Sequence, residues 1–164
     1  MPRAARIAPN GNIYHVLTRG NNSQNIFKDD NDFKKYLELI FRYKGKYHFK
    51  LYHYVLMTNH VYLVIETTEN GGSLSEIMKC INISYAQHYK GRYKHIGHFW
   101  QDRYKNIIIS KDAYLLACGS YVELNAVRAR IVEDPKEYKW SSYVVYAYCN
   151  KDLIVDDHPN SEFH

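Results

Sequence analysis

Residues 55–66 read Val-Leu-Met-Thr-Asn-His-Val-Tyr-Leu-Val-Ile-Glu, and this stretch decides the fold. Two runs rich in β-branched and aliphatic residues flank the pair Thr58-Asn59. β-Branched residues favour strands, whereas asparagine favours tight turns. The stretch therefore predicts two strands joined by a turn or bend, the second of them starting at His60.

The strand that starts at His60 has two unlike faces, because successive side chains of a strand point to opposite sides of the sheet. One face is uniformly apolar and consists of Val61, Leu63 and Ile65. We expect helices to cover that face. The other face begins with His60 and Tyr62, an imidazole beside a phenol. Such a pair suits a functional site, but it is equally compatible with two half-exposed strand residues.

The rest of the chain supplies a regular series of elements. Apolar periodicity and turn residues predict strands at 13–19, 49–57, 60–66 and 103–110, and helices at 29–47, from 73 onward, and from 112 to about 125. Asp30 or Asp32 can cap the first helix, and Ser73 with Glu76 forms a capping box for the second. The order predicts an α+β fold, ferredoxin-like in its first half, with a mainly antiparallel sheet and helices packed on one face. We expect one domain over residues 1–164, with a core at about 12–148 and a polar C-terminal tail.

Charge and aromatic content favour a nucleic-acid partner. The chain has 22 Lys and Arg against 17 Asp and Glu, a formal charge of +5, and 17 tyrosines. Cations interleaved with aromatic rings suit single-stranded nucleic acid, although tyrosines also fill ordinary strands. The candidate DNA-binding residues are Arg19, Arg92, Lys94, Trp100, Arg103 and Lys105.

Cysteine usage and hydropathy indicate the compartment. The three cysteines are far apart and form no Cys-x-x-Cys pair, which is typical of reduced thiols. No apolar run reaches the length of a membrane span, and the N-terminus lacks the apolar core of a signal peptide. We expect a cytoplasmic protein without a membrane partner.

The helix expected after residue 112 carries a second candidate pair. Tyr121 and Asn125 are four residues apart, so a phenol hydroxyl and a carboxamide can project from one helix face. A surface tyrosine above a helix-terminal asparagine would have the same spacing. Periodicity alone therefore leaves a functional and a structural interpretation open.

Five stretches, in order and at suitable spacing, resemble the blocks of the single-tyrosine HUH transposases. That family includes small insertion-sequence transposases and REP-associated tyrosine transposases. The matching stretches are Tyr-His-Val-Leu-Thr-Arg-Gly-Asn at 14–21, Met-Thr-Asn-His-Val-Tyr-Leu at 57–63, Gly-His-Phe-Trp-Gln-Asp-Arg-Tyr at 97–104, Tyr-Val-Glu-Leu-Asn-Ala-Val-Arg-Ala at 121–129, and Trp-Ser-Ser-Tyr at 140–143. Together they cover roughly residues 12–146.

The resemblance implies metal-assisted cleavage and rejoining of single-stranded or hairpin DNA through a 5′-phosphotyrosine intermediate. It implies Tyr121 as nucleophile, and His60 and Asn125 as ligands of Mg²⁺ or Mn²⁺. Family members include both dimers and monomers, so the resemblance is compatible with a homodimer. Tyr62 stands where the family has its second histidine, and a phenol is a poor ligand for a divalent cation. The alternative is therefore a weakened or inactive member that binds such DNA without cutting it.

Overall fold

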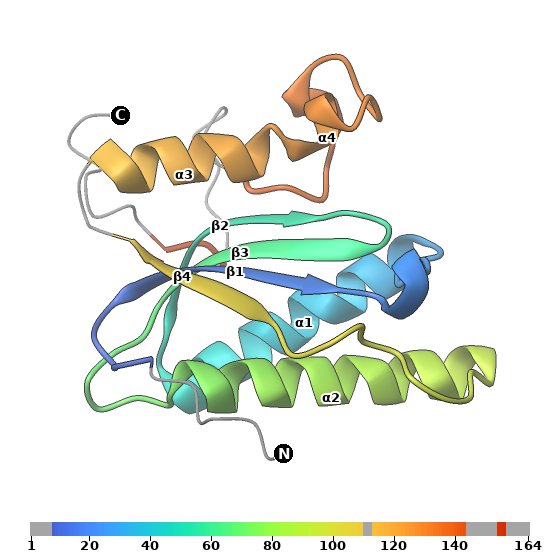
Figure 1. Cartoon of the computed structure of the whole chain (residues 1–164), viewed down its shortest axis with the longest axis horizontal. Helices are drawn as coiled ribbons and strands as arrows, with labels where there is room; N and C mark the ends of the chain where they lie inside the picture. Colours follow the sequence, from blue (N-terminus) through green and yellow to red (C-terminus); the bar gives the residue numbers. More distant parts are fainter. Residues whose placement is uncertain (1–7, 110–112, 144–153, 157–164) are drawn as a thin grey trace.

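The computed structural model describes residues 8–109, 113–143 and 154–156 (Figure 1). Its centre is a four-stranded antiparallel sheet in the order β2-β3-β1-β4. The strands are β1 (Ile13–Arg19), β2 (Lys50–Leu56), β3 (His60–Glu66) and β4 (Lys105–Ile109). The main helices are α1 (Asp30–Tyr47), α2 (Leu74–Tyr93) and α3 (Ala113–Glu123). Short turns of helix follow at η1 (Asn21–Ser23), α4 (Asn125–Arg128) and η2 (Pro135–Glu137).

The element order and the antiparallel sheet confirm the predicted α+β fold. β1 and β3 have the predicted bounds, and β2 and β3 form the predicted hairpin, closed by the Met57 N–H donating to the His60 carbonyl at 2.8 Å. Ser73 and Glu76 form the predicted capping box of α2. The cap of α1 is Asp29 rather than Asp30 or Asp32, because its side chain accepts the Asp32 N–H at 3.1 Å.

Helices cover both faces of the sheet. α1 and α2 lie on the predicted apolar face, that of Val61, Leu63 and Ile65, and α3 lies on the opposite face (Figure 1). The expectation of helices on one face thus holds for α1 and α2 only. α3 covers the second face because that face is also largely apolar and packs against Leu115 and Val122. The position of α3 brings a helix over the face that carries His60 and Tyr62.

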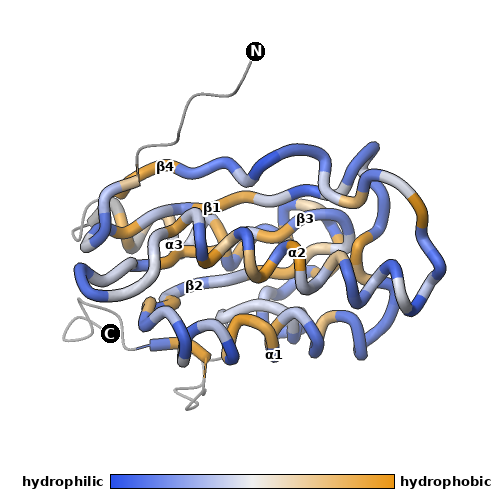
Figure 2. Tube along the Cα trace, turned by 90° about the horizontal axis from the view of Figure 1, so that it is seen from below, coloured by the Kyte–Doolittle hydropathy of each residue, from blue (hydrophilic) through white to orange (hydrophobic). Residues whose placement is uncertain are grey.

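Each face of the sheet has its own core. The core under α1 and α2 contains Leu63, Ile65, Ile77, Met78 and Tyr85, all at most 1% exposed. The smaller core under α3 contains Val55, Tyr62, Val64, Leu115 and Val122. In Figure 2 the apolar colour recurs along the strands and in bands on the helices, whereas the connections are mainly hydrophilic.

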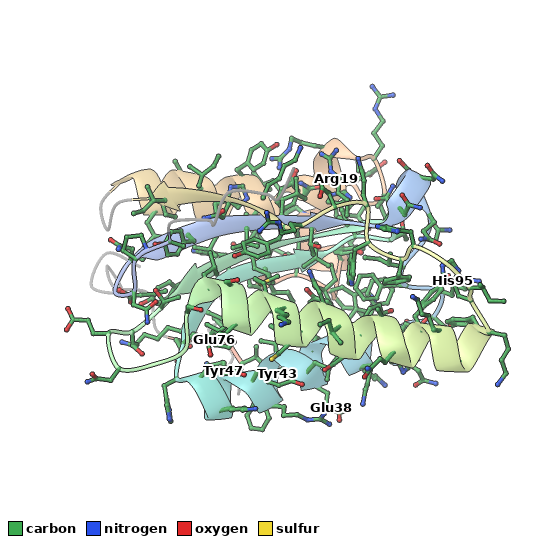
Figure 3. All side chains as sticks on the ribbon, turned by 60° about the horizontal axis from the view of Figure 1, so that its bottom comes forward. Arg19, Glu38, Tyr43, Tyr47, Glu76 and His95 are labelled. Carbon is green, nitrogen blue, oxygen red and sulfur yellow. The ribbon has the colours of Figure 1, made fainter. Side chains whose placement is uncertain are left out.

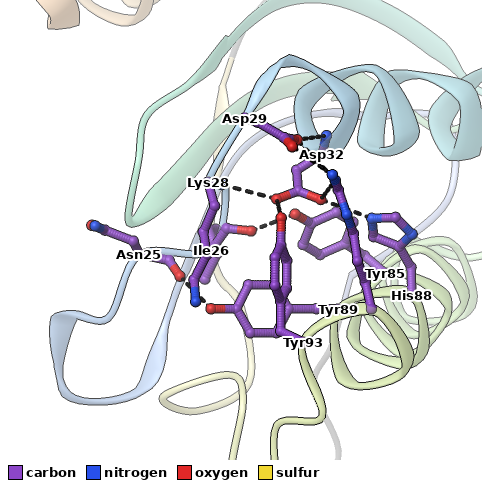
Figure 4. A network of polar contacts seen from close by, with 10 residues as sticks. Asn25, Ile26, Lys28, Asp29, Asp32, Tyr85, His88, Tyr89 and Tyr93 are labelled. Atoms are coloured by element: carbon purple, nitrogen blue, oxygen red, sulfur yellow. Dashed lines mark hydrogen bonds and ion pairs between the residues drawn. The ribbon is translucent and has the colours of Figure 1, made fainter.

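Asp32 joins the start of α1 to the end of α2 through a buried polar network (Figure 4). Its carboxylate accepts hydrogen bonds from the Tyr93 hydroxyl at 2.5 Å, Arg92 at 2.8 Å and the Lys28 N–H at 2.9 Å, and lies 3.0 Å from His88. Asp29 binds the same Arg92 guanidinium at 2.8 Å. The network neutralises a carboxylate that is fully shielded from solvent.

Two expectations fall on parts of the chain outside the described residues. These are Asp112, expected to start α3, and most of the polar tail after residue 148. Within the described ranges, no helix is both long and apolar enough to cross a membrane.

Candidate active site and nucleic-acid surface

The structure brings Tyr62 and Tyr121 together from two elements. Tyr62 lies on the face of β3 that α3 covers, and Tyr121 lies near the end of α3. Their ring centroids are 6.1 Å apart with the planes at 80°. Tyr121 is 49% exposed, whereas Tyr62 is only 9% exposed. The accessible phenol is therefore that of Tyr121.

His60 also contacts Tyr62 edge-on, with ring centroids 5.2 Å apart. Its Nδ1 is 2.7 Å from the Asn59 carboxamide oxygen, which accepts hydrogen bonds only. In the tautomer with a proton on Nδ1, that nitrogen donates to Asn59, and Nε2 keeps its lone pair. Burial and the Arg19 cation lower the pKa of His60, and a side-chain hydrogen bond with Asn125 partly offsets them. The balance of these effects favours the neutral imidazole.

The donors fit a divalent cation only in part. A neutral His60 nitrogen and the Asn125 oxygen are suitable ligands, and Asn59 orients the imidazole as second ligand shells commonly do. Tyr62 does not fit, because burial and the neighbouring Tyr121 raise its pKa, although Arg19 acts against them, and a protonated phenol is a poor ligand. No group of three His, Cys, Asp or Glu side chains within the described ranges could hold a metal. The site suits a cation held by two side chains and otherwise by water.

Two neighbours of the nucleophile candidate were missed in the sequence. His15 on β1 stacks on Tyr62 at 5.2 Å and meets Tyr121 edge-on at 6.3 Å. Alternation along β1, together with its pairing to β3, could have found it. The Arg128 guanidinium lies 3.9 Å from the centre of the Tyr121 ring and donates to the Tyr121 carbonyl. No periodicity predicts that contact, because the chain leaves α3 before Asn125.

A polar hollow adjoins the site at the end of β1. It has a volume of about 230 Å³ and is lined by Arg19, Gly20, Ser23, Asn59 and His60. Arg19 and His60 are cross-strand partners, which places a cation at the mouth of the site. In Figure 3, Arg19 and His95 lie toward the same end of the molecule, away from Glu76 at the start of α2.

A larger groove of about 800 Å³ runs between α2 and residues 97–104. Its apolar lining includes Met78, Ile83, Ala86, Phe99 and Trp100, and its cations are Lys79, Lys90 and Arg103. The Gln101 N–H donates to the Arg19 carbonyl at 2.9 Å, so the wall of the groove is joined to the end of β1. Rings beside cations suit bases beside phosphates.

The structure separates the predicted DNA-binding residues into three groups. Trp100 and Arg103 line the groove, and the Trp100 indole donates to the Asn82 carbonyl at 2.8 Å. Lys94, Lys105 and Arg19 are exposed but do not line the groove. The third group is Arg92, whose guanidinium forms ion pairs with Asp29 and Asp32. Lys79 was missed.

Comparisons with known proteins agree with the fold. The family model described as "Transposase IS200 like" matches residues 10–125. A REP-associated tyrosine transposase bound to a REP hairpin has the same fold, with a TM-score of 0.74, 16% identity, and coverage of 95% of this chain and 92% of that one. A putative transposase from Deinococcus radiodurans R1 gives a TM-score of 0.50 at 14% identity, covering 75% of this chain and 95% of that one. No curated protein sequence matches.

The two similar structures establish the fold, and the family model establishes the family membership of the chain. That model spans residues 10–125 of a chain of 164, and its range includes His60, Tyr121 and Asn125. The protein therefore belongs to the IS200-like transposase family.

Proposed function

We propose that the protein cuts and rejoins single-stranded DNA through a covalent bond to Tyr121. The observation that carries this proposal is the placement of an accessible Tyr121 ring beside Tyr62, close to the His60–Asn125 pair. Membership of a transposase family supports chemistry on DNA.

In the proposed reaction, the Tyr121 oxygen attacks the phosphorus of a backbone phosphate and gives up its proton to solvent. The bond from phosphorus to the 3′ oxygen breaks, and that oxygen takes up a proton. The products are a 5′-phosphotyrosyl link and a free 3′-hydroxyl. Because the link is again a phosphodiester, attack by a 3′-hydroxyl rejoins DNA without another source of energy.

The surrounding side chains would position the phosphate and offset its charge. Arg128 packs on the Tyr121 ring and Arg19 lines the polar hollow beside His60, so both guanidinium groups are available to offset phosphate charge. His60 and Asn125 would hold a divalent cation, Mg²⁺ or Mn²⁺. That cation, when bound, supplies Lewis-acid polarisation of a phosphate oxygen.

The proposed partner is single-stranded DNA that carries a hairpin. The REP-associated relative is bound to a REP hairpin, and the groove beside α2 offers rings and cations to an unpaired strand. A homodimer is part of the same proposal. β4 is an edge strand, and its Ile107 and Ile108 are 64% and 55% exposed.

The second candidate function is binding of the same DNA without cleavage. Tyr62 favours it, because its protonated phenol removes one ligand from the site while leaving the groove intact. A denaturing gel of labelled hairpin DNA after incubation with the wild-type protein distinguishes the two functions. A covalent protein–DNA band supports cleavage, and its absence at every Mn²⁺ and Mg²⁺ concentration on cognate DNA supports binding alone.

Tyr62→His is expected to lower the Mn²⁺ concentration for half-maximal adduct formation by about tenfold or more, because it adds an imidazole to the ligand set. A metal titration of adduct formation measures the effect. Tyr62→Phe is the matched control, since it removes the hydroxyl without adding a ligand. Equal metal requirements in the histidine and phenylalanine variants would show that position 62 does not face the cation.

Replacing Lys79, Lys90 and Arg103 together by alanine is expected to weaken hairpin binding and flatten its salt dependence. Loss of three phosphate contacts on a single strand should reduce the log–log slope by about 2. Fluorescence anisotropy between low and physiological salt measures the slope. The control replaces the exposed Lys34, Lys46 and Lys50, which do not line the groove. Equal slopes in both triple variants would place the DNA surface elsewhere.

A further inference from the structure

A buried carboxylate ends the helix that carries Tyr121. Glu123 is 7% exposed and lies two residues after Tyr121 and two before Asn125. Its Oε2 is 2.7 Å from the His53 Nδ1 and 2.5 Å from the Ser142 Oγ. Both distances are short hydrogen bonds to a single oxygen. A carboxylate is costly to bury unless such donors satisfy it, so this one is bound in one geometry.

The first donor belongs to the sheet. His53 lies on β2, is 5% exposed, and its ring lies directly against α3 at Gly119. A Cβ at position 119 would lie 2.4 Å from the His53 Nε2, closer than real atoms approach. The three atoms nearest to that Cβ all belong to the His53 ring. The missing side chain at Gly119 therefore makes room for this imidazole beneath the helix.

The second donor belongs to the segment after η2. Ser142 is fully buried, and its Oγ accepts the Tyr54 N–H at 2.9 Å. The Ser142 N–H donates to the Tyr54 carbonyl at 2.9 Å, and the Leu56 N–H donates to the Trp140 carbonyl at 2.8 Å. These bonds fix residues 140–142 along β2. Glu123 thus connects α3 to β2 directly through His53 and indirectly through Ser142.

The arrangement differs from a nucleophilic serine site. The Ser142 hydroxyl is hydrogen-bonded to the carboxylate of Glu123, and it is closed to solvent. A serine nucleophile would need an adjacent base and an open path to its substrate. These side chains therefore hold structure in place and do not meet DNA.

We propose that His53, Glu123 and Ser142 form an anchor that sets the position of α3, and with it Tyr121 and Asn125, above β3. The proposal rests on the function proposed above. The apolar contacts of Leu115 and Val122 hold α3 on the sheet without fixing its direction. A directional bond two residues from the nucleophile supplies that constraint. The three are positioning residues, because they act on the phosphate only through Tyr121 and Asn125.

Glu123→Gln tests the anchor, because glutamine keeps the shape and removes the charge. A displacement of about 1 Å at a reacting group can cost about 100-fold in rate, so we expect adduct formation at saturating DNA to slow between about 10- and 100-fold. The dissociation constant for hairpin DNA should not change, since the groove is untouched. Glu133→Gln, on an exposed glutamate, is the matched control and should behave as wild type. An adduct rate within twofold of wild type for Glu123→Gln would overturn the proposal.

A second pair of variants separates positioning from packing. Gly119→Ala should displace α3, and adding His53→Ala should restore the space and the melting temperature. The double variant should still form adduct slowly, because Glu123 has lost its imidazole partner. Recovery of the wild-type rate of adduct formation would show that packing alone positions α3 and would contradict the proposed anchor.

Hydrogen exchange tests the anchor without requiring DNA cleavage. Amides of α3 should exchange faster in Glu123→Gln than in wild type and Glu133→Gln. If the wild type forms no adduct, the cleavage function fails, and α3 protection alone then decides whether the anchor exists. Unchanged protection in Glu123→Gln would overturn the anchor whatever the activity.

Discussion

Tyr121→Phe is expected to abolish the covalent protein–DNA product, by at least about a thousandfold, while hairpin binding stays at the wild-type level. The substitution removes only the attacking oxygen. The ring that packs under Arg128 and beside Tyr62 remains, so the local structure should persist. Denaturing gels measure the adduct, and anisotropy measures binding.

Two controls test whether the loss of adduct is specific to the Tyr121 hydroxyl. Tyr47→Phe removes the hydroxyl of a tyrosine on α1, on the face of the sheet opposite α3, and should leave the adduct unchanged. The Tyr62→His background should show the same loss on Tyr121→Phe, because the nucleophile is the same. An undiminished adduct in Tyr121→Phe would assign the attack to another side chain, and peptide mapping of the adduct would identify it.

The largest expected effect on stability is that of Asp32→Ala, about 3 kcal/mol in the free energy of unfolding. Removal of the carboxylate leaves Arg92, Tyr93 and His88 without their shared acceptor at the junction of α1 and α2. Urea denaturation measures the loss. Asp30→Ala is the control, because Asp30 pairs with Lys139 at the surface, where the two side chains are 58% and 62% exposed. That exposed pair should contribute less than about 1 kcal/mol.

The lowered pKa of Asp32 predicts how its contribution to stability changes at acid pH. Burial alone would raise the pKa of Asp32, but hydrogen bonds from Tyr93, the Lys28 N–H, His88 and Arg92 outweigh burial and hold the pKa below its ordinary value. A group with a lowered folded-state pKa stabilises the protein fully above its unfolded pKa of about 4. That contribution is lost as the pH falls through the folded value. The stability gap between wild type and Asp32→Ala should therefore narrow below pH of about 4, and a constant gap would contradict the assignment.

Local sequence rules predicted the elements well, because they depend on neighbours in the chain. The turn at Thr58-Asn59 and the capping box at Ser73 need only a few consecutive residues, and both are present. The observed N-cap of α1 is Asp29 and not the predicted Asp30 or Asp32. Several neighbouring carboxylates could cap this helix, and only the backbone conformation selects one of them. Placing α3 on the second face required knowing that the face around Tyr62 is buried.

Motifs in the sequence single out candidate-site residues, but they do not reveal contacts between residues that are far apart in the chain. His60 and Asn125 were singled out together, and an interaction with the Asn125 side chain contributes to the pKa of His60. Arg128 reaches Tyr121 only because the chain turns after α3. Arg92 looked like a free cation in a basic segment, but its partners Asp29 and Asp32 are about sixty residues away in the sequence. A count of charges therefore overstates the cations available to a ligand.

The central position of β1 has a consequence for how the protein folds. β1 pairs with β3 and also with β4, whose residues follow it by some ninety positions. Such distant pairings slow folding, because a long loop must close before the contacts form. During synthesis at about 5–20 residues per second, His60 leaves the ribosome several seconds before α3. A nascent chain is therefore expected to hold the hairpin of β2 and β3 with one apolar face uncovered until α3 emerges, and Tyr121 joins the fold later than the sheet on which α3 packs.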